Sequence, residues 1–357
     1  VREFADEYPG RTAAIDDLAA GYDPDAVFDQ TDATPQEFGY ATPEYVPLVD
    51  VVAAGYGDDI GLTGGDDCVF VLEGDPDDPS SVRRGFVELT RVSGEVQRKM
   101  RGGRISMVFQ DPLTSLNPVY TVGNQIKESL RLHQGLTGQE ATQEAADLLE
   151  AVGIPDARRR VNEYPHQFSG GMRQRAVIAM ALACEPEMLI CDEPTTALDV
   201  TIQAQILDLI AEIQETRDVA VMFITHDMGV IADVSDRVNV MYAGEVVESA
   251  PVEPLFADPK HPYTNGLLAS IQGGQVGETL TTIEGSVPTP NEEPTYCRFA
   301  PRSPKAFNEC DAVHPESVPI DGDTDDHTAA CLLYPEDEST EAAIARHRGQ
   351  TERGDRK

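Results

Sequence analysis

The sequence predicts an α/β fold built on a parallel β-sheet that is buried on both faces. Two apolar runs, Met188–Cys191 and Val219–Thr225, have the length and composition of buried strands. Between them, Thr201–Glu215 repeats apolar residues at helical spacing, which predicts a helix with one buried face. Continuously apolar strands are typical of parallel sheets covered by helices, so we expect this class of fold.

The composition limits the class of protein. The chain has 357 residues, enough for one large core or two modest ones, and its formal net charge is −36. So acidic a surface argues against nucleic acid as a direct ligand, because contacts to phosphates need Lys and Arg. It suggests a halophilic source, in which high internal salt screens the repulsion; the alternative is that the acidity is concentrated in a disordered tail or insertion.

Three further features bear on targeting and redox chemistry. No run of about 18 apolar residues occurs in the sequence, so none is expected to span a membrane. No signal peptide is recognised at the start. Six cysteines in a chain of this size do not suggest a disulfide framework.

Residues 1–85 are expected to be an acidic, loop-rich insertion that is partly disordered. The stretch Thr12–Val82 contains no Lys or Arg and is rich in Asp, Glu, Pro and Gly. Two mostly apolar runs within it, Leu48–Ala54 and Val69–Leu72, are candidate strands of one small sheet.

Residues 86–270 are expected to be the main domain, with a helical subdomain at about residues 120–180. Its first elements are predicted to be a short helix within Val87–Arg101, a strand at Ile105–Phe109, and helices at Val122–His133 and Gln139–Val152. Near its end, Arg237–Tyr242 and Glu245–Glu248 predict a β-hairpin that turns at Ala243-Gly244.

Two carboxylates, Asp192 and Glu193, follow the strand Met188–Cys191 directly. A buried parallel strand that ends at acids delivers them to the carboxyl edge of the sheet, where open α/β sheets bind ligands. Paired acids at this edge suit Mg²⁺ and a base that orients an attacking water. The alternative is an ordinary strand end with solvated charges.

A second candidate motif, Ser169-Gly170-Gly171, precedes an alanine-rich apolar run. Ser169 is a good N-cap for a helix, and the two glycines let the backbone come close to a ligand. The free N–H groups and the positive end of such a helix suit a phosphate. The alternative is an ordinary loop.

In this order, the motifs resemble those of the nucleotide-binding subunits of ABC transporters. Ser169–Gln174 is similar to the signature loop of that family, Leu189–Glu193 to its Walker B strand and catalytic glutamate, and Ala197–Asp199 to its D-loop. Gln110, after the strand Ile105–Phe109, resembles the Q-loop glutamine. His226, after the strand Val219–Thr225, resembles the switch histidine.

The resemblance implies a P-loop NTPase-like ATPase domain that uses ATP and Mg²⁺ and works as a pair of subunits, identical or different. It implies that Asp192 and Gln110 hold Mg²⁺, that Glu193 polarises the attacking water, and that His226 maintains the transition-state geometry. It also implies that Ser169, Gly170 and Gly171 of one subunit face the γ-phosphate bound by the other, and that Asp199 belongs to the nucleotide site.

Two stretches resemble the peptide and nickel importer branch of that family: Asp111–Pro118 and His261–Thr264. The resemblance implies an ATPase that energises an importer of oligopeptides, dipeptides or similar solutes. It would lie at the cytoplasmic face of the membrane on permease subunits, served indirectly by a solute-binding protein. One alternative is a soluble ABC ATPase of DNA repair or translation, although long coiled coils and tandem ATPase halves are absent.

The sequence departs from the family at the phosphate-binding P-loop (Walker A). This loop ends in Gly-Lys-Ser/Thr, and the chain contains no Gly-Lys dipeptide. The glycine-rich Gly61–Asp66 ends in acids, which would repel phosphate. We expect that a strand–loop–helix unit of about 30 residues is missing before Val1 and that the printed chain is inactive alone. The alternative is a non-hydrolysing relic that has lost this loop.

Residues 271–357 are expected to be a C-terminal extension whose polar tail frays from Glu336 onward. It contains Cys297, Cys310 and Cys331. The resemblance implies four cysteines in this region and a 4Fe–4S cluster held by them, but Ser303 stands where the second cysteine is expected. Three thiolates hold such a cluster only with a fourth ligand from outside, so metal binding here stays open.

Overall fold

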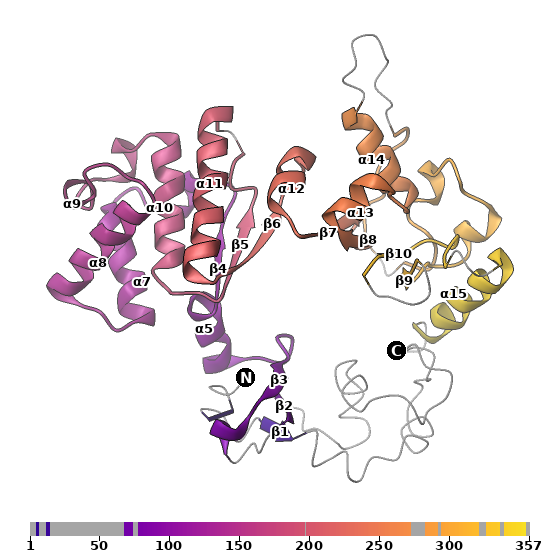
Figure 1. The fold of residues 1–357 in the computed structure, drawn as a ribbon, viewed down its shortest axis with the longest axis horizontal. Helices are drawn as coiled ribbons and strands as arrows, with labels where there is room; N and C mark the ends of the chain where they lie inside the picture. The colour runs from indigo at the N-terminus through magenta and orange to yellow at the C-terminus, as the bar shows by residue number, and fades with distance from the viewer. Residues whose placement is uncertain are drawn as a thin grey trace. The chain divides into compact units, whose positions relative to one another are not determined.

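The computed structural model describes residues 5–6, 12–14, 68–73, 78–196, 198–272, 283–291, 294–320, 326–335 and 339–354. It divides into two compact units, Val1–Gly94 with Ile344–Lys357, and Glu95–Ala343 (Figure 1). The candidate strand Leu48–Ala54 and the glycine-rich Gly61–Asp66 lie outside the described residues.

The first unit contains a small three-stranded sheet. Its strands are β1 (Thr12–Ala14), β2 (Val69–Glu73) and β3 (Arg84–Val87), in that order. β2 pairs parallel with β1 and antiparallel with β3, and its residues Val69–Val71 are buried. The strand predicted at Val69–Leu72 is therefore present, whereas β3 was not predicted because Arg-Gly-Phe-Val carries no apolar alternation.

In the C-terminal tail, where we expected fraying, the structure contains helix α15 (Thr340–Gly354).

The central sheet of the second unit consists of three parallel strands. These are β4 (Ile105–Val108), β5 (Met188–Asp192) and β6 (Ala220–Ile224), in that order. Val108 lies opposite Cys191, and Asp192 lies opposite Ile224. All three strands thus end at the same edge of the sheet, as the sequence predicts for a parallel sheet.

Strand β6 is less buried than its apolar sequence predicts. Met222 is 44% exposed and Ile224 is 45% exposed, and Ala220 is exposed as well. Among the described residues, β6 pairs with β5 alone, so no described strand continues the sheet beyond it. The exposed residues alternate along β6 and so share one face of the sheet. The prediction that this strand is buried on both faces is wrong, because the described residues leave that face uncovered.

Helix α5 (Gly94–Gly103) forms the link into β4, and α6 (Pro112–Ser115) follows it. The helix expected within Val87–Arg101 therefore starts only at Gly94, after β3. Asp111 caps α6 by accepting a hydrogen bond from Leu113 N at 2.8 Å. Short 3₁₀ turns occur at Pro79–Ser81, Pro165–Gln167, Ala300–Arg302 and Asn308–Asp311.

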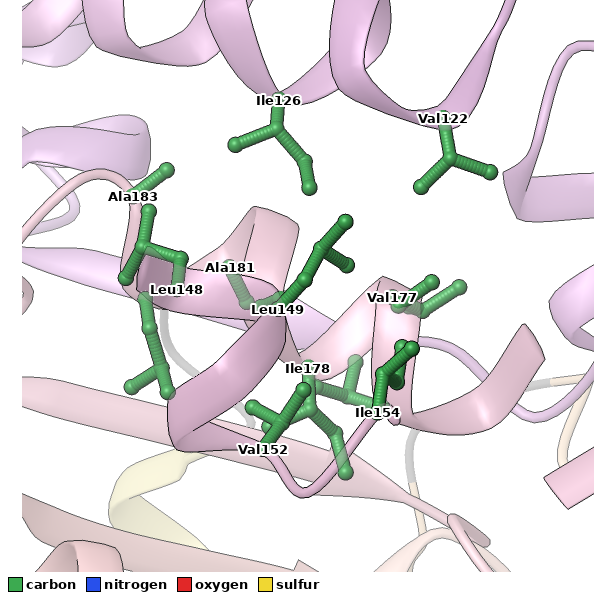
Figure 2. Close-up of a cluster of buried hydrophobic side chains, with 14 of the residues drawn as sticks. Val122, Ile126, Leu148, Leu149, Val152, Ile154, Val177, Ile178, Ala181 and Ala183 are labelled. Atoms are coloured by element: carbon green, nitrogen blue, oxygen red, sulfur yellow. The ribbon is translucent and has the colours of Figure 1, made fainter. Parts of the chain in front are cut away.

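A helical layer packs beside the sheet and is built from α7 (Val122–His133), α8 (Gly138–Ala151), α9 (Ala157–Arg160) and α10 (Gly170–Leu182). Figure 2 shows its core, where Ile126, Leu149 and Ile178 are fully buried. This core continues to Leu189 and Cys191 of β5. Packing of apolar side chains therefore fixes α10 relative to the strand that carries the paired acids.

Helix α11 (Val200–Arg217) connects β5 to β6 and matches the predicted amphipathic pattern. Its buried residues are Ile206, Leu209, Ile210 and Ile213, while Ile202 is half-buried. These four buried residues all belong to the hydrophobic core that includes residues of α10.

A second sheet has the strand order β7-β8-β10-β9, formed by β7 (Arg237–Tyr242), β8 (Glu245–Pro251), β9 (Val318–Pro319) and β10 (Thr328–Ala329). The predicted hairpin is present and turns at Ala243 and Gly244, whose φ angles are 49° and 89°. Two positive φ values suit the tight turns that join twisted antiparallel strands. The neighbouring helices are α12 (Met228–Val234), α13 (Val252–Ala257) and α14 (Pro262–Gln272).

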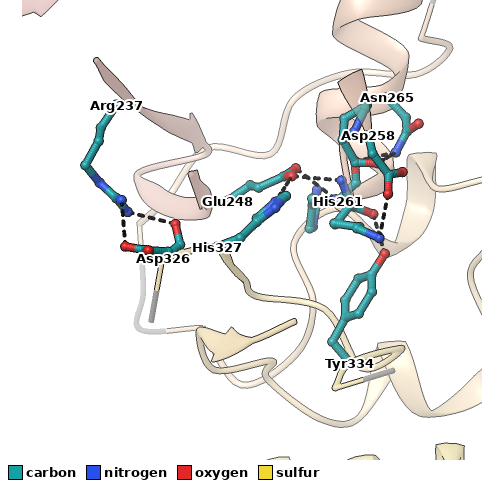
Figure 3. Close-up of polar contacts among 10 residues, drawn as sticks. Arg237, Glu248, Asp258, His261, Asn265, Asp326, His327 and Tyr334 are labelled. Atoms are coloured by element: carbon teal, nitrogen blue, oxygen red, sulfur yellow. Dashed lines mark hydrogen bonds and ion pairs between the residues drawn. The ribbon is translucent and has the colours of Figure 1, made fainter. Parts of the chain in front are cut away.

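A buried carboxylate, Glu248, attaches the C-terminal extension to this hairpin (Figure 3). Its Oε1 atom accepts hydrogen bonds from Lys260 N at 2.7 Å and His327 Nε2 at 2.8 Å, and its Oε2 atom accepts from His261 N at 2.8 Å. Burial lowers the pKa of His261 to about 4, so this imidazole is neutral. Tyr334 adds a hydrogen bond from its hydroxyl to Lys260 O at 2.9 Å.

Candidate active site

Three polar side chains meet at the carboxyl edge of the central sheet. Gln110 follows β4, Glu193 follows β5 and His226 follows β6. Gln110 Nε2 donates to Glu193 Oε2 at 2.7 Å, and His226 Nδ1 lies 3.0 Å from Glu193 Oε1. The structure thus brings together the three residues that the sequence predicted at this edge, within a single chain.

The backbone of Glu193 is held in an unusual conformation. Its φ angle is 44°, in the left-handed region that residues with a side chain seldom adopt. The N–H of Glu193 donates to the carbonyl of Ile224 at 2.8 Å, which anchors the residue to the end of β6. Strained backbone held by its surroundings is typical of functional sites. The Glu193 side chain is 23% exposed, so it remains accessible to solvent.

Thr196 is a fourth member of this cluster, which the sequence analysis missed. Its hydroxyl donates to Glu193 Oε2 at 2.7 Å, and its N–H donates to the carbonyl of Glu193 at 3.1 Å. The second bond closes a turn with Pro194 at its second position, where proline is favoured. The sequence Glu-Pro-Thr-Thr therefore contained a usable signal, a turn that brings its fourth side chain beside its first.

These contacts change the acidity of Glu193. The hydrogen bond from Thr196 has the largest effect in lowering the pKa of Glu193, and the hydrogen bond from His226 follows it. Partial burial opposes them, while Gln110 adds a smaller effect in the same direction. Hydrogen bonds to the charged form favour that form, so Glu193 is ionised at neutral pH.

Asp192 is the last residue of β5 and is half-buried. Carboxylate and amide oxygens are the donors that Mg²⁺ prefers, so the side chains of Asp192 and Gln110 suit a magnesium ion at this edge. The residues present therefore fit the metal and water side of a magnesium–nucleotide complex. The cradle for the other phosphates is not provided by the printed sequence, which has no Gly-Lys dipeptide.

The Ser169–Gly171 loop starts helix α10 as predicted. Ser169 Oγ accepts from Met172 N at 3.4 Å and caps the helix. A Cβ atom at Gly171 would lie 2.7 Å from Ile202 Cγ2, so glycine is needed here for close packing against α11. Asp199 caps α11 by accepting from Ile202 N at 3.0 Å. Among the described contacts within one chain, none joins this loop to Glu193.

The three cysteines of the extension gather around a small cavity of about 20 Å³, together with Ser303 and with aromatic and aliphatic side chains. Burial raises the pKa of all three thiols, and raises that of Cys331 to about 12. Metal clusters bind thiolates, and a cavity of this size holds about one water molecule. No group of three Cys, His, Asp or Glu side chains in the described residues is arranged to hold a metal. The described residues therefore give no support to a 4Fe–4S cluster here.

Helices of the described residues are all too short or too polar to cross a membrane. Two family models match the chain: "ABC transporter" matches residues 80–196, and "Oligopeptide/dipeptide transporter, C-terminal region" matches residues 247–310. The second match covers the hairpin strand β8, α14 and the first two cysteines of the extension.

Two curated relatives from Bacillus subtilis (strain 168) cover most of the same region. The chain is 51% identical over 258 residues to the dipeptide transport ATP-binding protein DppD, across 72% of this chain and 76% of DppD. It is 48% identical over 259 residues to the oligopeptide transport ATP-binding protein AppD, across 72% of this chain and 78% of AppD. From these similarities and the arrangement of Gln110, Glu193 and His226, the chain belongs to the ABC transporter family of ATP-binding proteins, in its oligopeptide/dipeptide branch.

Proposed function

We propose that the protein is the ATP-hydrolysing subunit of an ABC importer for peptides or similar solutes. The observation that carries this proposal is the contact of Glu193 with both Gln110 and His226 at one edge of the sheet. Bound Mg²⁺ would offset the negative charge of the phosphates. Asp192 and Gln110 are the residues that would hold it, and the relatives' names support a peptide as the transported solute.

Each side chain has a geometric role in this proposal. Glu193 is ionised and accepts a hydrogen bond from the attacking water, which orients the water toward the γ-phosphate. His226 keeps the Glu193 carboxylate in place through its Nδ1 atom and in this way maintains the geometry of the transition state. Positioning and charge stabilisation account for most of the rate gain in phosphoryl transfer, so small displacements of these residues are costly.

We propose that the working form contains two such ATPase subunits. Ser169, Gly170 and Gly171 of one subunit would approach the nucleotide held by the other, since they do not contact Glu193 of their own chain. Val200, which follows Asp199 at the start of α11, is 82% exposed, and an apolar side chain so exposed beside the site supports an interface there.

The permease subunits would dock beside Gln110. Four apolar side chains near it are strongly exposed: Phe109, Leu113, Val119 and Tyr120 are 52%, 60%, 71% and 55% exposed. A groove of about 490 Å³ along α7 and beside the start of α8 includes Tyr120 in its lining. Apolar surface rimmed by polar residues is typical of protein interaction sites. This docking would hold the ATPase at the cytoplasmic face of the membrane.

A phosphate-binding unit is the remaining requirement. We propose that a strand–loop–helix segment supplies it, with its strand paired to the edge of β6 that no described strand occupies and its helix over the face on which Met222 and Ile224 are exposed. The genomic DNA before the codon for Val1 tests this directly. An in-frame Gly-Lys-Ser/Thr loop supports it, whereas a stop codon favours the non-hydrolysing relic.

The activity itself is tested with Glu193→Gln in a chain that carries the phosphate loop. We expect ATP binding to be kept and turnover to fall by roughly 10²–10⁴-fold, because a positioned base contributes about this much. Turnover close to that of the wild type would contradict the assignment. Recovery of the protein with membranes and with permease subunits separates the importer from a soluble ATPase of DNA repair or translation.

A further inference from the structure

Thr196 makes two separate contacts with Glu193. Its backbone N–H donates to the Glu193 carbonyl at 3.1 Å, and its side-chain hydroxyl donates to Glu193 Oε2 at 2.7 Å. The first contact closes the turn. The second acts on the carboxylate itself, and its length is that of a charge-assisted hydrogen bond. The two effects can therefore be separated by substitution of the side chain alone.

The hydroxyl of Thr196 is fixed more firmly than the other donors to Glu193. The turn that carries it is four residues long, contains Pro194, and starts from a residue anchored by its N–H to Ile224. His226 is 79% exposed at its side chain, and Gln110 has a long, flexible side chain. Thr196 is exposed as well, but among the three described donors its hydroxyl is the one attached to Glu193 by a closed turn, so it is the donor best placed to fix the carboxylate.

We propose that Thr196 is a positioning residue for ATP hydrolysis: its hydroxyl holds Oε2 of Glu193, so that Oε1 faces His226 and the carboxylate meets the attacking water in one orientation. This inference rests on the proposed function, in which Glu193 orients that water. Gln110 shares Oε2 with Thr196, which leaves Oε1 for His226 and the water.

Loss of the hydroxyl should let the Glu193 carboxylate rotate without opening the turn, because the backbone hydrogen bond from Thr196 N to the Glu193 carbonyl stays in place.

The test is the carboxyl ¹³C chemical shift of Glu193 at pH 7 in the full chain, measured by NMR with ¹³C in the glutamate carboxyl groups, because this shift responds to the hydrogen bonds that the carboxylate accepts. The Glu193 signal is the one that disappears in Glu193→Gln. We expect Thr196→Val to move this signal from its wild-type position, and Thr196→Ser, which keeps the hydroxyl, to leave it there. Thr142→Val removes a hydroxyl that bonds Gly138 O on α8 and should leave Glu193 unchanged. Thr196→Ala repeats the measurement should valine disturb the fold.

The same Glu193 chemical shift in the wild type, Thr196→Val and Thr196→Ala would overturn the proposal. This outcome does not depend on hydrolysis, so it is distinct from failure of the proposed function, which Glu193→Gln reports. In a chain with the phosphate loop, Thr196→Val should lower kcat roughly tenfold, the effect of one hydrogen bond to a charged group. KM for ATP should stay unchanged, and Thr196→Ser should keep kcat close to that of the wild type.

Discussion

Two carboxylates of this protein each contact a histidine, yet they lie in different surroundings. Glu193, at the edge of the central sheet, is 23% exposed and its partner His226 is 79% exposed. Glu248, between the hairpin and the C-terminal extension, is fully buried and its partner His327 is 16% exposed. The same pair of residue types is therefore open to ligands in one place and sealed in the other.

The hydrogen-bond donors to the two carboxylates, Glu193 and Glu248, also differ. Glu193 accepts only from side chains, those of Gln110, Thr196 and His226, in the described contacts. Glu248 accepts from two backbone N–H groups, which cannot turn away, as well as from His327 (Figure 3). A side-chain donor can move away and leave its place to water or phosphate, whereas a backbone donor is fixed and holds two parts of the fold together. Burial and donor type separate a reactive acid from a structural one.

The largest expected difference between the two carboxylates is in their contribution to the stability of the fold. Glu248→Ala should lower the free energy of unfolding by about 3–5 kcal/mol, because it leaves buried donors without an acceptor. Glu193→Ala should change it by less than about 1 kcal/mol, since its contacts are near solvent. Urea unfolding of both variants checks this. Equal losses in the two variants would remove the distinction between the sites.

For activity the order should be reversed: the histidine that contacts Glu193 should matter more than the histidine that contacts Glu248. In a chain with the phosphate loop, His226→Ala should reduce turnover by roughly 10²-fold, or about 2.7 kcal/mol of transition-state stabilisation. His327→Ala should leave turnover unchanged and lower the free energy of unfolding by about 1–3 kcal/mol, as expected for a lost hydrogen bond to a buried acceptor. Steady-state ATPase rates and denaturation curves for both variants test the contrast. A loss of turnover in His327→Ala would show that the extension acts on the active site.

A third pair, His314 and Glu245, offers an intermediate case. Its Nε2–Oε1 distance is 2.7 Å, and the side chains are 19% and 26% exposed. Burial, the largest single effect, lowers the pKa of His314, but the contacts with Glu316 and Glu245 together outweigh it, so the pKa is raised above 6.5. The protonated form is therefore favoured in the folded state.

This pair should add a small dependence of stability on pH. A raised pKa in the folded state gives stabilisation that is complete below the unfolded value of 6.5 and is lost as the pH rises through the folded value. The free energy of unfolding should therefore be higher at pH 6 than at pH 8, and the difference should shrink in His314→Gln. An unchanged difference in that variant would mean that other groups control it.

Much of the fold could be predicted from sequence because the signals are local. The bounds of α7, Val122–His133, coincide with the predicted ones, since a threonine cap and apolar spacing mark them. The exposed face of β6 could not be predicted, because an apolar run does not reveal which neighbours cover it. Thr196 was missed because its role depends on a turn geometry rather than on a known motif.

The sequence by itself determined the strands β4, β5 and β6, the helices α7, α8, α10 and α11, and the position of Gln110, Glu193 and His226 after three parallel strands. Periodicity, caps and strand ends are written in neighbouring residues, so no long-range information is needed for them. Only the tertiary structure decided which acid is exposed, which donors hold it, and that Gly171 is required for packing against Ile202. Those properties depend on distances between residues that are remote in the chain, which packing alone fixes.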